Sequence, residues 1–244
     1  MTQGRDSAKH SKKQMADWQQ LTDDVALLQF PLRAFGIDFR RNVTLLRLRD
    51  SRVLIHSTAP FVSEDVKAIR RFGQPAWLVE ATSLHDTFAK AGCAAFPELP
   101  YFAPADFANG GGVATEPRPA IPKEWAGEIE MLKIGGLRLV REYAFLHCTS
   151  RTLVLADLLI HFPPELRGSS HFFVQRIMRL PDLLGISLFF RLMIRDKKRF
   201  AESMRILLGW DFDRIVVAHS EPVLHDAKSV FARALRERGL APSG

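Results

Sequence analysis

The chain has 244 residues, of which 47% are hydrophobic and 25% charged, and it carries a net charge of +7. This composition is that of a soluble globular protein with enough residues to bury a sizeable core. The two cysteines, Cys93 and Cys148, stand far apart and outside any CxxC spacing, which argues against a disulfide framework and a thiolate zinc site. The positive balance favours anionic partners, although the same charges also suit an ordinary solvated surface.

The first 20 residues are polar and predict a poorly ordered tail, disordered over residues 1–20. They lack the apolar segment of a secretory signal, and no apolar run in the chain is long enough to span a bilayer. We therefore expect a cytoplasmic protein with a single domain over residues 21–244.

The first half of the domain predicts a hairpin, a helix and a buried strand. Two β-rich runs at 43–48 and 53–55 flank a short polar turn, which is a hairpin signal. Residues 63–73 begin with a capping serine, continue with acidic residues and stop at Gly73, which is typical of a helix. The run AWLVE at 76–80 follows as a buried strand.

The second half predicts more strands around two irregular segments. Residues 103–123 contain a GGG run and four prolines, so they predict a long surface loop. Residues 163–208 predict a helical insertion broken at prolines and Gly185. Further strands are predicted by EIEMLKI, LRLVREYAFLH, RTLVLADLL and FDRIVVAHS, and a closing amphipathic helix by HDAKSVFARALRERG. Strands followed by helices in both halves predict sheets with helices outside them.

Polar side chains that could bind a metal follow four of the apolar strands. The candidates are His85 with Asp86, His147, Asp157 and His219. Strands buried on both faces deliver such residues to one rim of a sheet, where sites are usually built. Imidazole and carboxylate groups together form a ligand set that zinc, manganese or iron accepts.

The order of these segments resembles the metallo-β-lactamase-fold superfamily over roughly residues 40–225. The hairpin VTLLRLRDSRVLIHS resembles the first strands of that fold, and AWLVEATSLHDTFA stands where the family carries H-x-H-x-D-H. EYAFLHCTSRTLVLADLL resembles the segment with a histidine, a serine and a strand ending in a bridging aspartate. RIVVAHSEPV resembles the last strand with its terminal histidine. The resemblance implies an α/β fold, a four-layer αββα sandwich.

The first metal motif departs from the family pattern. Ala81 and Ser83 stand where the family has its first two histidines. His85 and Asp86 stand in the places of the aspartate and the third histidine, in swapped order. By this alignment one metal site keeps only His147 and Asp157, and the other keeps His85, Asp86, Asp157 and His219.

The resemblance therefore implies at most one divalent metal, zinc, manganese or iron, or none at all. It argues against two-metal hydrolysis, which needs both ions. We expect a metal-dependent hydrolase in which Asp86 and Asp157 are the candidate catalytic residues, acting on a small-molecule substrate that the sequence does not identify. The alternative is a non-catalytic binding or scaffold protein derived from this fold.

Each candidate residue also has a structural alternative. His85 and Asp86 fit a helix N-terminus, where an acidic residue is favourable. Asp157 fits a carboxylate that pairs with an arginine such as Arg151, and His219 fits a buried neutral imidazole between two loops. Ligand and structural roles both stay open at this point.

The helical insertion combines apolar and basic residues in HFFVQRIMRL and LFFRLMIRDKKRF. We favour packing on the sheet with basic ends in water, and a lid facing anionic membrane lipid is the alternative. The eighteen phenylalanines beside two tyrosines leave an apolar substrate pocket open. Aromatic and basic residues do not alternate along the strands, so no nucleic-acid partner is expected.

Overall fold

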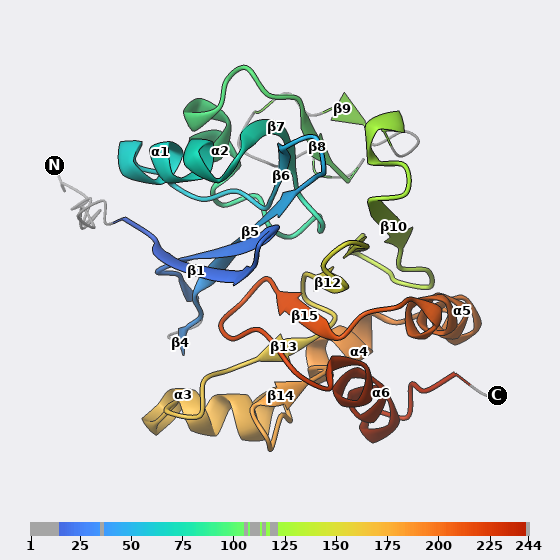
Figure 1. Cartoon of the computed structure of the whole chain (residues 1–244). Helices are drawn as coiled ribbons and strands as arrows, with labels where there is room; N and C mark the ends of the chain where they lie inside the picture. The colour runs from blue at the N-terminus through green and yellow to red at the C-terminus, as the bar shows by residue number, and fades with distance from the viewer. Residues whose placement is uncertain are drawn as a thin grey trace, which may run out of the picture.

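The computed structural model describes residues 15–34, 37–104, 107, 113, 116–117 and 122–242. Two β-sheets face each other in this part of the chain, and helices cover the outer face of each (Figure 1). The layers therefore run helix, sheet, sheet, helix, which is the predicted αββα sandwich.

The first sheet contains the N-terminal strands. They are β1 (Asp17–Thr22), β2 (Val25–Phe30), β5 (Arg41–Arg47), β6 (Arg52–His56), β7 (Gln74–Val79), β8 (Tyr101–Ala103) and β9 (Glu116–Pro117), in the spatial order β1-β2-β5-β6-β7-β8-β9. Neighbours are antiparallel from β1 to β6 and parallel from β6 to β9. The predicted hairpin is confirmed as β5 and β6, which pair antiparallel.

The second sheet contains the strands after residue 128. They are β10 (Ile129–Lys133), β11 (Tyr143–His147), β12 (Thr152–Leu155) and β15 (Arg214–Val217), in that spatial order. β11 pairs antiparallel with both β10 and β12, and β15 lies parallel to β12. Two short ribbons stand beside the sheets: β3 (Arg33–Ala34) with β4 (Ile37–Asp38), and β13 (Ile160–His161) with β14 (Leu184–Gly185).

Helices cover both outer faces. The first sheet carries α1 (Ser63–Phe72) and α2 (Ala89–Ala95), and the second carries α4 (Leu188–Met193), α5 (Lys197–Gly209) and α6 (Ala227–Glu237). A shorter helix, α3 (Gly168–Phe172), continues into a π-helical turn at Phe173–Ile177. No helix in the described ranges is long and apolar enough to cross a membrane.

Strand side chains alternate between separate apolar cores. In β12, Leu153 and Leu155 pack beneath the helices, whereas Val154 points into the space between the sheets. In β6, Val53 and Ile55 likewise face the helices on the other side. Successive side chains of a strand point to opposite faces, so a sheet that is covered on both faces needs continuously apolar strands. This explains why the central strands read as unbroken apolar runs.

The boundary of the predicted tail is wrong by a few residues. Residues 1–14 lie outside the described residues, but β1 begins at Asp17, inside the tail predicted over residues 1–20. Four of the six β1 residues are exposed. An edge strand is held by backbone hydrogen bonds to one neighbour, here β2, so it needs few apolar side chains and gives no apolar signal in the sequence.

The two irregular segments differ in how much of them the structure describes. Most of the predicted loop over 103–123 lies outside the described residues, and the described part includes the two-residue strand β9. The predicted insertion over 163–208 is helical in α3, α4 and α5, but β14 interrupts it and α5 continues to Gly209.

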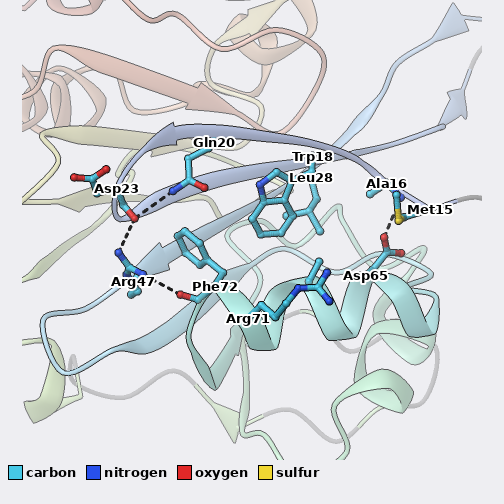
Figure 2. A pocket seen from close by; sticks show the side chains of 11 residues that line it. Met15, Ala16, Trp18, Gln20, Asp23, Leu28, Arg47, Asp65, Arg71 and Phe72 are labelled. Atoms are coloured by element: carbon cyan, nitrogen blue, oxygen red, sulfur yellow. Dashed lines mark hydrogen bonds between the residues drawn. The ribbon is translucent and has the colours of Figure 1, made fainter.

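A cavity of about 690 Å³ lies between β1 and α1 (Figure 2). Its polar groups bond to one another: Asp65 Oδ1 accepts from the Ala16 amide at 2.9 Å. Arg47 donates to the carbonyl oxygens of Phe72 and Asp23 at 3.1 and 2.7 Å. These bonds attach the start of β1 to α1, and none of the candidate metal ligands lines this cavity.

Phe145→Ala tests the core between the sheets. Phe145 is fully buried, with its ring centroid 5.1 Å from that of His56 in the opposite sheet. The substitution leaves a cavity and should lower the free energy of unfolding by about 3–5 kcal/mol in urea titrations. Leu192→Ala, on the exposed side of α4, is the control and should change it by less than about 0.5 kcal/mol. Equal effects from both would contradict this packing.

Candidate metal centre

Strand direction brings the candidate residues to one edge of the sandwich. Because β12 and β15 are parallel, their last paired residues lie opposite each other, and Asp157 and His219 each follow by two positions. His85 comes from the other sheet, in the loop after β7. That loop meets the second sheet through a bridge between Thr82 and Glu142. The site therefore lies at the seam between the sheets.

His85, Asp157 and His219 form a compact group, named here the His-Asp-His cluster. Asp157 Oδ1 lies 3.3 Å from His85 Nε2 and 3.5 Å from His219 Nε2, and the two Nε2 atoms are 3.2 Å apart. The two imidazoles are only 9% and 8% exposed. Three sequence-predicted ligands are thus brought to one point.

The outer nitrogens of both imidazoles face acceptors. His219 Nδ1 lies 3.2 Å from the carbonyl oxygen of Arg40, which can only accept, so Nδ1 carries the hydrogen. His85 Nδ1 faces Glu80 Oε1 at 3.6 Å. His219 Nε2 therefore carries a lone pair, which lies 3.2 Å from His85 Nε2 and 3.5 Å from Asp157 Oδ1. Three electron-rich atoms at this separation repel unless a proton or a metal cation lies between them.

The charges around the cluster keep Asp157 ionised. Burial disfavours the charged carboxylate, but the two neighbouring imidazoles outweigh burial and hold the pKa of Asp157 well below its usual value. Burial and Arg41 oppose protonation of His85, yet the carboxylates of Asp157 and Glu80 raise its pKa overall. Burial lowers the pKa of His219, and Asp157 offsets this only in part. An ionised carboxylate beside a neutral imidazole is what a metal ion requires of its ligands.

A buried ion pair supports His85 from behind. Glu80 Oε2 lies 3.0 Å from Arg41 Nη2, and the two side chains are 0% and 3% exposed. Ser57 donates to both oxygens of Glu80 at 3.0 and 3.2 Å, and Thr58 donates to one at 3.4 Å. Burial raises the pKa of Glu80, but Arg41 and His85 outweigh it, so the net shift is downward. Glu80 is therefore a fixed anion that orients the His85 ring.

Glu142 holds the loop that carries Asp157. Its fully buried carboxylate accepts the amide hydrogens of Ala156, Asp157 and Leu158 at 3.2, 3.1 and 3.0 Å. Burial, together with the charge of Asp157, raises the pKa of Glu142 to about 8. Sequence reasoning missed this residue because it opens a strand and belongs to no recognisable motif.

His147 does not reach the cluster. It pairs with Thr152 at the start of β12, whereas Asp157 lies beyond the other end of that strand. Five residues of extended chain separate Thr152 from Asp157, so the backbone of His147 lies about 16 Å from that of Asp157. Its ring nitrogens lie 2.7 Å from Ser150 Oγ and 3.1 Å from the Arg47 carbonyl oxygen. The structure thus places the predicted ligand His147 in a structural hydrogen-bond network.

The predicted pair His85 and Asp86 is divided. His85 joins the cluster, whereas the carboxylate of Asp86 is not part of the group that the described residues form. The Asp86 carbonyl oxygen accepts from the amide of Ala89, the first residue of α2, at 3.0 Å. Asp86 therefore lies in the turn before α2, whose N-cap is Phe88, and only His85 of the pair joins the cluster.

A cavity of about 430 Å³ opens beside the cluster. All three cluster residues line it, and most of the remaining wall is apolar: Leu32, Phe39, Leu84, Ile160, Met178, Phe189, Phe190 and Met193, with Thr87 and Ser187. Helix α4 supplies three of these side chains. The helical insertion thus both packs on the second sheet and forms a wall of the cavity.

The donor atoms of the cluster fit a divalent metal. Two neutral imidazoles and a carboxylate are ordinary zinc ligands, and tetrahedral bonds of about 2.0–2.1 Å place neighbouring ligand atoms about 3.3 Å apart. The three distances in the cluster, 3.2, 3.3 and 3.5 Å, bracket that value. The Arg40 carbonyl oxygen behind His219 is a partner of the kind that metal-ligating histidines commonly have.

Glu80→Ala should destabilise the protein strongly, because it leaves the buried Arg41 guanidinium without its counter-charge. We expect a loss of about 3–5 kcal/mol in unfolding free energy, measured by urea denaturation. The double variant Arg41→Met with Glu80→Met should lose less than Glu80→Ala alone. Arg70→Ala, which breaks the exposed pair with Glu98, is the control and should cost less than about 1 kcal/mol. A double variant that loses more than Glu80→Ala would contradict the charge argument.

Comparisons with known proteins agree with this architecture. No family model and no curated protein matches the sequence. Among solved structures, the metallo-β-lactamase FIM-1 from Pseudomonas aeruginosa in its mono-zinc form is similar, with a TM-score of 0.60 and 13% identity over 95% of this chain and 99% of that one. A metallo-β-lactamase from Erythrobacter litoralis gives a TM-score of 0.60 and 12% identity over 92% of both chains. TMB-1 gives a TM-score of 0.58 and 14% identity over 90% of this chain and 98% of that one. The chain therefore has the metallo-β-lactamase fold.

Proposed function

We propose that this protein binds one divalent metal ion at His85, Asp157 and His219 and hydrolyses a small molecule that carries an apolar group. The observation that carries the proposal is the convergence of three donor atoms, 3.2 to 3.5 Å apart, with His219 oriented by the Arg40 carbonyl oxygen. The likeness to solved metallo-β-lactamases supports the fold on which the proposal depends.

Zinc is the metal that these distances favour. Tetrahedral zinc bonds place neighbouring ligand atoms about 3.3 Å apart, and the three separations of 3.2, 3.3 and 3.5 Å match that spacing. Three protein ligands also leave one tetrahedral position for water or substrate, as catalytic zinc sites do. A structural zinc site would use four protein ligands.

A metal ion bound here would acidify a water molecule and polarise an ester, amide or phosphate oxygen of the substrate. The residues of the chain position these groups. Asp157 supplies the negative charge, and Glu142 holds its loop through three amides. Glu80 and Arg41 keep His85 in place. Because these side chains are buried, the site is held rigid before any substrate arrives.

The cavity supports a substrate with an apolar part. Its wall is aliphatic and aromatic apart from the cluster and the hydroxyls of Thr87 and Ser187. A polar scissile group would lie at the cluster while the apolar part fills the cavity. Burying apolar surface there excludes water, which strengthens the electrostatic interactions of the site.

Metal content tests the first part of the proposal. Protein purified without chelator should hold about one zinc per chain by elemental analysis, as three-ligand catalytic sites do. The variants Asp157→Ala and His219→Ala should each lose most of the bound zinc, because two ligands rarely retain the ion. Asp86→Asn is the matched control, since Asp86 lies beside the cluster without belonging to it, and it should keep the parental content. Equal zinc in Asp157→Ala and the parent would refute the site.

Substrate preference tests the second part. In a series of acyl nitrophenyl esters, kcat/KM should rise about four-fold for each added methylene until the cavity is full. Met193→Trp should narrow the cavity and raise KM for the longer esters while leaving the acetyl ester unchanged. A flat dependence on chain length in the zinc-loaded parent would contradict the apolar substrate but not the metal site.

A further inference from the structure

Large apolar side chains remain exposed around the mouth of the cavity. The exposed fractions are 50% for Leu84, 86% for Leu139, 47% for Phe189 and 57% for Leu192. These four residues are named here the mouth patch. Apolar side chains that gather on a surface mark contact with a partner or a membrane.

The residues of the mouth patch are distant in sequence but lie on adjoining segments. Leu84 and Phe189 line the same cavity. Leu192 follows Phe189 by one turn of α4, so the two lie on the same side of that helix. The amide of the residue before Leu139 donates to the carbonyl oxygen of Met193, at the end of α4, at 2.8 Å.

The segments that carry the patch are strongly basic. Residues 138–141 and 172–195 contain six arginines and one acidic residue, Asp182. All six arginines are exposed: Arg138, Arg141, Arg176, Arg179, Arg191 and Arg195. Two further apolar side chains on the neighbouring helical turn, Phe172 and Ile177, are 62% and 45% exposed. The ring of Phe173 stacks on Phe189 with centroids 6.4 Å apart, which joins that turn to the patch.

We propose that the mouth patch docks on the surface of an anionic phospholipid bilayer. Apolar tips enter the boundary between headgroups and acyl chains, while arginine side chains run along the apolar surface and reach lipid phosphates. Phosphate groups accept bidentate hydrogen bonds from guanidinium, which suits a surface made of arginine and not lysine. Two residues of the patch, Leu84 and Phe189, line a cavity with an apolar wall, so apolar surroundings continue from the docked surface into the protein. A bilayer provides both the negative charge and the apolar phase.

Vesicle co-sedimentation of the full-length chain tests the docking. Binding is expected to vesicles of phosphatidylcholine with phosphatidylserine, and much less to phosphatidylcholine alone or at high salt. Arg138→Ala and Arg191→Ala should each weaken binding about five-fold, as loss of one basic contact does. The double variant Phe189→Ser with Leu192→Ser should lose most of its vesicle binding. These positions are exposed, so the fold should survive, which circular dichroism checks.

Matched controls come from the other outer helices. Ile206→Ser on α5 and Arg236→Ala on α6 remove an equally exposed apolar side chain and an exposed arginine away from the patch, and should leave binding unchanged. Equal losses in these controls, or full binding by Phe189→Ser with Leu192→Ser, would overturn the proposal in favour of general charge attraction. Absence of binding at low salt would also overturn it. Asp157→Ala should bind vesicles like the parent, so this test is independent of the metal site.

Discussion

The parallel pairing of β12 with β15 is the constraint on which the candidate site depends. It brings Asp157 and His219, which are 62 positions apart, to the same edge of the second sheet. The loop after β7 then carries His85 across the seam from the first sheet. Each of these residues is polar and nearly buried, which costs free energy, so the apolar cores on both sides must offset that cost.

Three of the five candidate residues meet in the His-Asp-His cluster, and strand direction explains why His147 does not. His85, Asp157 and His219 each follow an apolar strand that runs towards the seam. His147 also ends an apolar strand, but β11 is antiparallel to β12 and therefore ends at the far edge. An apolar run in a sequence shows that a strand exists and does not show which way it points. The order of strands and helices predicted sheets with helices outside them, and the family resemblance implied the four layers. The exposed edge strand β1 left no apolar signal.

The supporting residues could not be inferred, because their partners are remote in sequence. Arg41 and Glu80 are separated by 39 positions; Arg41 begins β5, and Glu80 directly follows β7. Glu142 bonds three amides that follow it by 14 to 16 positions. A carboxylate in a strand is indistinguishable in sequence from one that faces solvent. Only the three-dimensional arrangement shows that Glu80 lies beside Arg41 and His85, and that Glu142 bonds the loop that carries Asp157.

The origin of the ligands in two sheets has a thermodynamic consequence. A bound ion would connect the two sheets of the sandwich, because His85 belongs to one layer and Asp157 and His219 belong to the other. Only the folded chain presents the three atoms together, so occupancy would stabilise the fold by mass action, by about 4 kcal/mol when the free ion exceeds its dissociation constant a thousand-fold. The two sheets would then separate and release the ion in one step, and the melting temperature would rise with the concentration of free metal ion.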